Sequence, residues 1–257
     1  MKNMIRAGIT AVVLSLGLAE PMVAGPFEDG MAAFGRRDYA TAMQLWRPLA
    51  DLGNAPAQVN LGLMYVNGQG VPQDYATAAS WFRKAADQGN APAQVNLGFM
   101  YQNGLGVPQD DAAAASWFRK AADQGNADAR ANLGLFYDEG RGGLQKDDRE
   151  AARLYKLAAD QGNAYGQNNL GVNYRDGVGG VSQDDHEAAR LFKLAVDQGN
   201  AFAQSNLGRF YAQGRGGLAK DDREATRLFK LAADQGHAPA QANLGLMYVN
   251  GQGVPQD

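Results

Sequence analysis

Apolar residues recur at helical spacing along most of the chain, and residues 74–104 show the pattern in full. The first apolar stripe shares one helix face and runs through Tyr75, Ala78, Ala79, Phe82, Ala85 and Ala86. Asp74 stands where an N-cap is favoured, and Gly89 supplies the left-handed residue that ends the helix. A second stripe follows a cap at Asn90, stops at Gly104 and runs through Ala93, Leu97, Met100 and Tyr101. The pattern therefore predicts a pair of helices, without the alternation typical of a strand.

This helical hairpin is repeated along the chain. An Asp-x-Gly element closes one helix of each copy every 36 or 37 residues, at Asp51, Asp87, Asp123, Asp160, Asp197 and Asp234. Residues 60–74 and 243–257 are identical in all fifteen letters. Periods of this length are typical of solenoids. The sequence therefore predicts an all-α fold, an α/α solenoid of antiparallel helix pairs.

A glycine stands in the middle of one helix of each pair, where it costs about 1 kcal/mol relative to alanine. These glycines are Gly62, Gly98, Gly134, Gly171, Gly208 and Gly245. Their recurrence predicts a close approach of the two helices at which a side chain would not fit. We expect the tyrosines three positions later to fill the core beside that contact; they are Tyr65, Tyr101, Tyr137, Tyr174, Tyr211 and Tyr248.

Three motifs follow each other in the repeats: Asn-Leu-Gly-x-x-Tyr-x-x-Gly, Gly-Val-Pro-Gln-Asp-Tyr or its variants, and Ala-x-x-Trp/Leu-Phe/Tyr-x-x-Ala-Ala-Asp-Gln-Gly-Asn-Ala. They closely resemble the Sel-one-like repeat, a relative of the tetratricopeptide repeat. The resemblance covers residues 54–257 as five full repeats and a truncated sixth. Residues 25–53 look like a divergent tetratricopeptide-like hairpin. The resemblance implies a right-handed superhelix that works as a scaffold for protein–protein interaction.

The first 24 residues have the pattern of a secretory signal peptide. Lys2 and Arg6 precede thirteen residues without charge, and small residues follow, with Ala19 and Ala24 as the candidate cleavage points. The uncharged run is shorter than the ~20 residues of a membrane-spanning helix, although a short N-terminal anchor is the alternative interpretation. We expect a periplasmic or secreted protein without stable membrane insertion after the signal is removed.

Composition narrows the possible chemistry. The chain has 24 Lys and Arg against 27 Asp and Glu, two histidines and no cysteine. Nucleic acid is therefore not an expected partner, and no catalytic residue, metal ligand or cofactor is predicted. The paired aspartates that begin some helices suit capping better than acid–base chemistry or calcium binding. The alternative function is a cell-wall or β-lactam hydrolase, because cysteine-rich secreted members of the family are associated with β-lactams.

The predicted partner is a protein or peptide segment, and the candidate binding residues come from two rows. One asparagine of each copy precedes the Leu-Gly pair, at Asn60, Asn96, Asn132, Asn169, Asn206 and Asn243. The tetratricopeptide resemblance places this row on the concave face, where an amide can pair with a peptide backbone; a hydrogen bond to the neighbouring repeat is the alternative. Selectivity would come from a varying row that follows the glycine and includes Leu63, Phe99, Leu135, Val172, Arg209 and Leu246.

A second varying row lies two positions before the leucine, at Val59, Val95, Ala131, Asn168, Ser205 and Ala242. Both varying rows predict a groove that is apolar in the N-terminal copies and more polar between Asn168 and Arg209. Either row could instead belong to the core between repeats, and the sequence leaves this choice open.

The last predicted helix, from about Ala238 to Asn250, has no outer helix of its own repeat, because Asp257 aligns with Asp74. Leu244, Met247 and Tyr248 would then lack their cover. We expect this stretch to fray and to promote weak self-association, unless a longer array or another molecule covers it.

Overall fold

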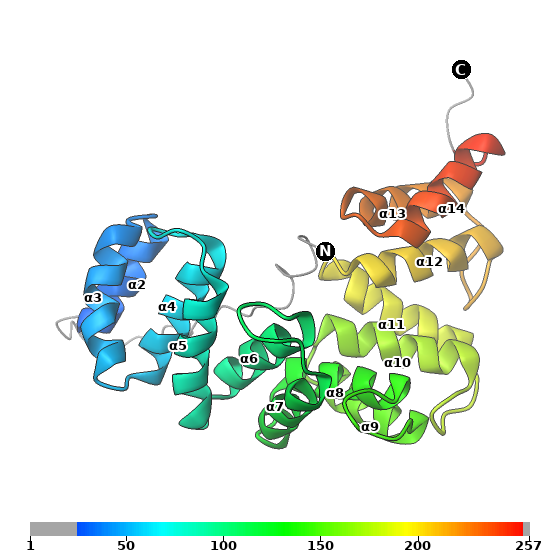
Figure 1. Cartoon of the computed structure of the whole chain (residues 1–257). Helices are drawn as coiled ribbons and strands as arrows, with labels where there is room; N and C mark the ends of the chain where they lie inside the picture. Colours follow the sequence, from blue (N-terminus) through cyan, green and yellow to red (C-terminus); the bar gives the residue numbers. More distant parts are fainter. Residues whose placement is uncertain (1–24, 254–257) are drawn as a thin grey trace, which may run out of the picture. The chain divides into compact units, whose positions relative to one another are not determined.

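The structure, a computed structural model, describes residues 25–253. The predicted signal peptide, residues 1–24, and the last four residues lie outside the described part. Within residues 25–253 the chain forms thirteen α-helices and no strand, and consecutive helices pack in pairs (Figure 1). The all-α prediction is therefore confirmed.

Helices with even labels begin each pair. They are α2 (Pro26–Gly35), α4 (Ala55–Asn67), α6 (Ala91–Asn103), α8 (Ala127–Glu139), α10 (Ala164–Asp176), α12 (Ala201–Gln213) and α14 (Ala238–Val249). Helices with odd labels complete the pairs. They are α3 (Tyr39–Asp51), α5 (Tyr75–Asp87), α7 (Asp111–Asp123), α9 (Asp148–Ala159), α11 (Asp185–Asp197) and α13 (Asp222–Asp234).

Side-chain caps start these helices at the expected residues. The Asp74 carboxylate accepts hydrogen bonds from the amides of Ala76 and Thr77 at the start of α5, at 2.9 and 3.1 Å. The hydrogen bonds from Thr77 lower the pKa of Asp74. Asn90 accepts from the Ala93 amide in the same way at the start of α6. The first aspartates of the Asp-Asp pairs accept backbone bonds in the same way, so their predicted capping role is confirmed; they are Asp110, Asp147, Asp184 and Asp221.

The second aspartate of the pair has a different role in two copies. Arg141 donates two hydrogen bonds to the Asp111 carboxylate, at 3.1 and 2.9 Å, and Arg215 donates two to Asp185, at 2.9 and 2.7 Å. Both arginines belong to the glycine-rich loop that follows the next even helix. Each bidentate pair therefore fixes a loop on the first turn of the preceding odd helix.

The contacts divide the chain into two compact units. Unit 1 comprises residues 1–129 and 141–143, and unit 2 comprises residues 130–140 and 144–257. In unit 1 one core cluster is centred on Phe82, Leu97 and Met100, and another contains Trp46. In unit 2 the clusters contain Tyr155, Phe192 and Phe229. Each unit thus has its own apolar core.

Mid-helix glycines lie against an aromatic ring of the following odd helix. A Cβ atom added at Gly62 would come within 2.5 Å of the Phe82 ring, and one added at Gly134 within 2.7 Å of the Tyr155 ring. The same holds for Gly98, Gly171 and Gly208, which face Phe118, Phe192 and Phe229. The predicted close approach is confirmed in these five copies. Gly245 is the exception, because no atom lies within 4 Å of an added Cβ there.

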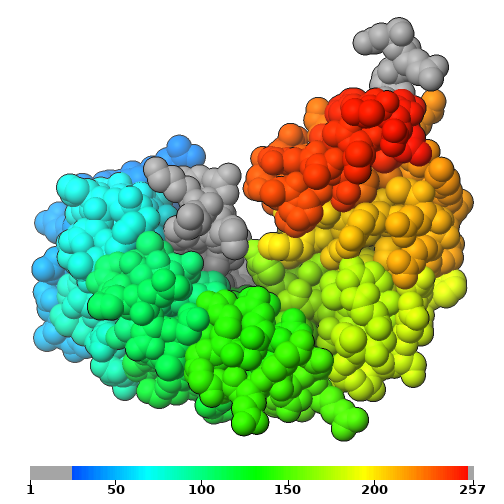
Figure 2. All heavy atoms as spheres, turned by 45° about the vertical axis from the view of Figure 1, so that its right-hand side comes forward, coloured from blue at the N-terminus to red at the C-terminus, as the bar shows by residue number. Residues whose placement is uncertain are grey.

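The prediction that the tyrosine row is core needs correction. The first five of these tyrosines are only half-buried, and Tyr248 is 54% exposed. The aromatic ring of the odd helix fills the contact at the glycine, so the tyrosine lies at its edge. Leu246 and Val249 of α14 are also exposed, at 59% and 83%, although Met247 is buried. Helix α14 forms the red end of unit 2 in Figure 2.

Buried glutamines connect successive repeats. Gln94 of α6 is 3% exposed and donates to the Ala86 carbonyl, and its own oxygen accepts from Gln124 at 2.8 Å. Equivalent bonds join Gln88 to Gln58, Gln198 to Gln167 and Gln235 to Gln204. The middle repeat has Arg130 at the accepting position, which carries no acceptor. This glutamine ladder was not predicted from the sequence.

The surface of the odd helices differs between the units. In unit 1 the Lys84 ammonium lies 4.0 Å from the centre of the Trp81 ring, and Lys120 lies 3.8 Å from that of Trp117. Unit 2 has leucine at both positions in each of its three odd helices. Where the tryptophan is absent, a lysine at the second position would have no cation–π partner, and the chain has leucine there instead.

Candidate functional site

The asparagine row lies in different surroundings in the two units. In unit 1 the Asn60 amide donates to the Met31 sulfur at 3.4 Å, which is a contact with the preceding hairpin. Asn96 is 1% exposed, and neither atom of its amide has a hydrogen-bond partner. A buried amide without partners is costly. Asn132 and Asn243 are half-buried.

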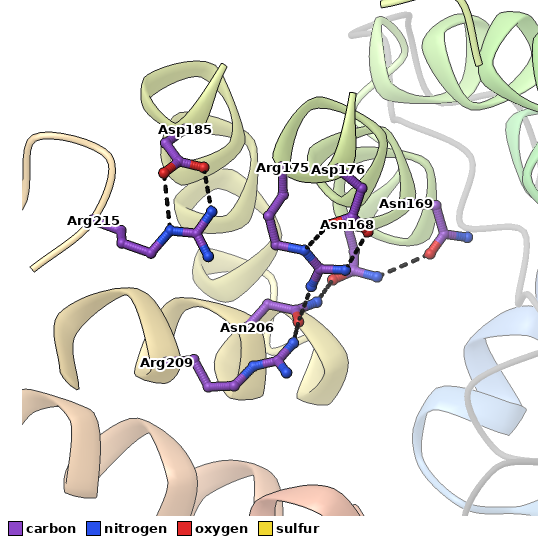
Figure 3. Close-up of polar contacts among 8 residues, drawn as sticks. All are labelled: Asn168, Asn169, Arg175, Asp176, Asp185, Asn206, Arg209 and Arg215. Carbon is purple, nitrogen blue, oxygen red and sulfur yellow. Dashed lines mark hydrogen bonds and ion pairs between the residues drawn. The ribbon is translucent and has the colours of Figure 1, made fainter. Parts of the chain in front are cut away.

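In unit 2 two members of the row, Asn169 and Asn206, belong to a hydrogen-bonded network, which we call the Arg175–Arg209 cluster (Figure 3). It consists of Asn168, Asn169, Arg175, Asp176, Asn206 and Arg209. Asn168 donates to Asn169 and accepts from Asn206, both at 2.9 Å. The Asn206 oxygen in turn accepts from both arginines, at 3.3 Å from Arg175 and 2.7 Å from Arg209. The network therefore connects α10 to α12 by hydrogen bonds between side chains.

The cluster gathers positive charge at one point. Arg175 also forms a bidentate ion pair with Asp176, at 2.7 and 2.6 Å, and this bond lowers the pKa of Asp176. Although Arg209 is exposed overall, the packing around its guanidinium and the charge of Arg175 lower the pKa of Arg209. Asn206 is neutral, so its contact with two arginines does not balance their charge. Arg209 has no carboxylate partner among the ion pairs of the described residues.

Three aromatic side chains lie beside the cluster, and we call them the aromatic row. Tyr165 of α10 and Phe202 of α12 are 39% and 41% exposed, with ring centres 6.4 Å apart. The His237 ring meets Phe202 edge-on at 4.9 Å. His237 lies close enough to Arg209 for that charge to contribute to lowering its pKa, after the larger effect of burial. The row thus extends over the starts of α10, α12 and α14.

The two varying rows turn out to be unequally exposed. Val59, Val95, Ala131, Asn168 and Ser205 are all buried, so this row belongs mainly to the core. In the other row Leu63 is buried, Phe99 packs edge-on against Phe118 at 5.5 Å, and Leu135 is half-buried. Arg209 and Leu246 are exposed. The polar character expected between Asn168 and Arg209 is present as the hydrogen-bonded network.

Several members of this site were not predicted from the sequence. Asn169, Asn206 and Arg209 were candidates, but Arg175, Asp176, Tyr165, Phe202 and His237 were not. A signal was available, because each of these residues differs from the residue at the same position in every other aligned copy of α4 to α14. The sequence alone does not show which helix faces meet, so it does not show that these residues lie close together in the fold.

No group of three or more His, Cys, Asp or Glu side chains within residues 25–253 could hold a metal ion. Among those residues, no helix has the length and apolar character needed to cross a membrane.

His237 allows a first test of the aromatic row. It is the N-cap of α14, but its side chain makes no capping bond, and its Nδ1 is buried without a partner. The other copies have asparagine there, so His237→Asn should add a cap that stabilises α14 by about 0.5–2 kcal/mol. Loss of the ring contact with Phe202 would offset only part of this gain. Amide hydrogen exchange in α14 should be slower in the variant than in the wild-type chain. Faster exchange in the variant would contradict the inference that His237 leaves α14 without a cap.

The same variant has a pH signature. Burial and Arg209 lower the pKa of His237 below its ordinary 6.5. The unfolded state then binds the proton more readily, so the local stability of α14 should fall as the pH drops below about 6.5. This loss should be present in the wild-type chain and absent in His237→Asn, when exchange rates are corrected for intrinsic pH dependence.

The family comparison agrees with the repeat pattern. The Sel1 repeat model matches residues 27–54, 55–90, 91–126, 127–163, 164–200, 201–237 and 238–257. The chain therefore belongs to the Sel1 repeat family. A search of curated proteins finds no match to the sequence.

Solved structures of the same family share the fold. A Sel1 repeat protein from Oxalobacter formigenes is 32% identical, with 91% of this chain and 92% of that one aligned and a TM-score of 0.78. A protective antigen of uropathogenic Escherichia coli with an SLR fold is 38% identical, with a TM-score of 0.69. That alignment covers 88% of this chain but only 49% of the antigen. An immunity protein from Pseudomonas aeruginosa is 20% identical with a TM-score of 0.53, which shows the fold alone.

Proposed function

We propose that this chain is an exported, non-enzymatic adaptor that binds a protein segment along its even helices. The Sel1 repeat fold is a helical scaffold commonly used for protein interaction. The observation that carries the proposal is the Arg175–Arg209 cluster with its aromatic row, in which Tyr165, Phe202 and Arg209 are exposed on one set of helices. Amides and arginines of this kind can pair with a peptide backbone and its side chains.

Export is part of the proposal and has its own test. Lys2, Arg6 and the uncharged stretch after them have the pattern of a secretory signal. We expect the chain in the periplasmic or secreted fraction, with a mature N-terminus after Ala24 or Ala19. N-terminal sequencing of the purified native protein checks this. An intact Met1 in the cytoplasmic fraction would contradict export.

The asparagine row supplies a binding prediction. Asn132→Ala combined with Asn169→Ala should weaken capture of the partner from an extract of the source organism, while most helicity remains. Asn169 also accepts from Asn168 and bonds the buried Tyr155, so some loss of stability is expected. Circular dichroism and thermal unfolding provide the control. If the double variant loses cooperative unfolding, the row is architectural and the binding role fails.

A hydrolase assay tests the competing function. Purified protein should not turn over nitrocefin or muropeptides above the rate of a buffer control. Robust turnover that a single substitution abolishes would overturn the adaptor proposal and favour a cell-wall or β-lactam hydrolase.

A further inference from the structure

The residues that distinguish unit 2 from the repeat pattern gather at one place. At the second position of the even helices from α4 to α14, three copies have proline and one has aspartate, but α10 and α12 have Tyr165 and Phe202. The position after the mid-helix glycine is apolar in five copies and is Arg209 in α12. Arg175 is the one arginine at the position four residues beyond that glycine. These departures all lie in the Arg175–Arg209 cluster and the aromatic row.

Helical spacing places three members of the site on one face of α12. Phe202, Asn206 and Arg209 of α12 are separated by four and then three residues, so they lie along a single stripe. At a rise of 1.5 Å per residue, the seven steps from Phe202 to Arg209 span about 10 Å. That length corresponds to about three residues of an extended chain.

The charge at this face is unbalanced. Arg175, Arg209 and Arg215 carry three positive charges, and their carboxylates, Asp176 and Asp185, carry two negative ones. One further carboxylate would balance the set. Arg209 is the exposed arginine that lacks an acidic partner among these pairs, and its guanidinium bonds only the neutral Asn206 in Figure 3.

The presence of His237 in the aromatic row is accompanied by the loss of a side-chain cap at the start of α14. The capping asparagine of the other copies is replaced by His237, which leaves α14 without a side-chain cap and Nδ1 without a partner. In return the His237 ring joins Phe202. Residues that break a local rule without a structural gain are often functional.

We propose that this face of α10, α12 and α14 binds an extended protein segment that carries an Asp or Glu side chain and, about three residues away, an aromatic side chain. The partner carboxylate pairs with Arg209 beside Arg175, and the partner ring packs against Phe202 and Tyr165. The inference rests on the proposed function and names the chemistry of its partner.

A carboxylate fits this site better than a phosphate. The net surplus is one positive charge, whereas a phosphate group carries about −1.5 to −2 at neutral pH. The Asp176 carboxylate also lies within the cluster and would repel the additional charge. The whole chain is acidic, with a net charge of −3, which disfavours a nucleic acid partner.

Designed peptides test the proposal with the full chain. The probe is a fluorescent twelve-residue Gly/Ser peptide, with blocked ends, that carries Glu and Phe three positions apart in either order. Matched peptides replace Glu by Gln or Lys, or Phe by Ala. We expect the Glu/Phe peptide to bind at least about ten times more tightly than the Gln and Lys versions, and its affinity to fall as salt rises.

Two double variants separate the cluster from general charge. Arg175→Ala with Arg209→Ala should reduce binding of the Glu/Phe peptide at least about tenfold. Arg190→Ala with Arg227→Ala removes the same two charges from exposed pairs with Glu187 and Glu224 on the odd helices, and should leave binding unchanged. If the first variant fails to fold, the single charge reversal Arg209→Glu decides, because it should favour the Lys peptide over the Glu peptide.

Three results would overturn the inference. The first is equal binding of the Glu, Gln and Lys peptides, or no binding of any of them. The second is unchanged affinity in the cluster variant. The third is displacement of the peptide by inorganic phosphate or oligothymidylate at equal concentration, which would indicate a phosphate site. If a cellular protein partner nevertheless binds elsewhere on the even helices, the proposed function stands and only this inference fails.

Discussion

Replacing Gly134 by valine is expected to destabilise the protein by about 1–3 kcal/mol. A Cβ atom at Gly134 would lie 2.7 and 2.9 Å from two ring carbons of Tyr155 and 3.3 Å from the Ala151 carbonyl. Tyr155 is itself buried, with 2% exposure and a pKa raised by that burial, so its ring has little room to move. For a chain of this size the midpoint of thermal unfolding should fall by roughly 2–4 °C for each kcal/mol lost.

Gly245→Val is the matched control, because it makes the same substitution at the equivalent position of the last repeat. No atom lies within 4 Å of an added Cβ there, and valine has a better helix propensity than glycine. This variant should be neutral or slightly more stable. Equal midpoints for the two variants would show that the glycine does not mark a close helix contact.

Gln94→Met is the second substitution with a large expected effect. It keeps the length of the side chain but removes both bonds of a buried amide, one to the Ala86 carbonyl at 3.1 Å and one from Gln124 at 2.8 Å. The Ala86 carbonyl keeps its bond from the Gly89 amide, and Gln124 keeps its bond to the Lys120 carbonyl. The cost is therefore that of two lost hydrogen bonds, about 0.5–1.5 kcal/mol each, or about 1–3 kcal/mol together. We expect a loss of stability in this range, measured by chemical unfolding.

Gln241 provides the control for the glutamine ladder. It occupies the same position in α14 but is exposed, and its bond to the Ala233 carbonyl is longer, at 3.3 Å. Gln241→Met should therefore change the free energy of unfolding by less than about 0.5 kcal/mol. If both variants lose the same stability, the ladder does not connect the repeats energetically.

The fold was largely predictable from the sequence, because its signals are local and repeated. Asp74 and Asn90 cap helices through backbone amides only two or three residues away, so neighbouring letters suffice to predict them. The glycine contact could be inferred because each copy has the same unusual residue. The identity of the atoms opposite could not, since Tyr155 and Phe82 belong to the next helix and no local rule names them.

The candidate site was less predictable, because it depends on contacts between copies. The Asn206 bond to Asn168 joins residues 38 positions apart, and only the packing of α10 on α12 makes it possible. The asparagine row has the same residue in every copy, but its members have different surroundings. Asn96 is buried without partners, whereas Asn206 is at the centre of a network. The departures of individual copies from the pattern were the more informative signal.

The central claim, that this chain binds a protein through the Arg175–Arg209 cluster and aromatic row of its even helices, is tested most directly by photo-cross-linking in cells of the source organism. A benzophenone amino acid is placed at Phe202 on α12 and, in a separate variant, at the exposed Lys193 on α11. We predict a protein adduct from position 202 that disappears when Arg175→Ala and Arg209→Ala are added, and no adduct from position 193. Adducts at position 193 alone, or at neither position, would contradict the account.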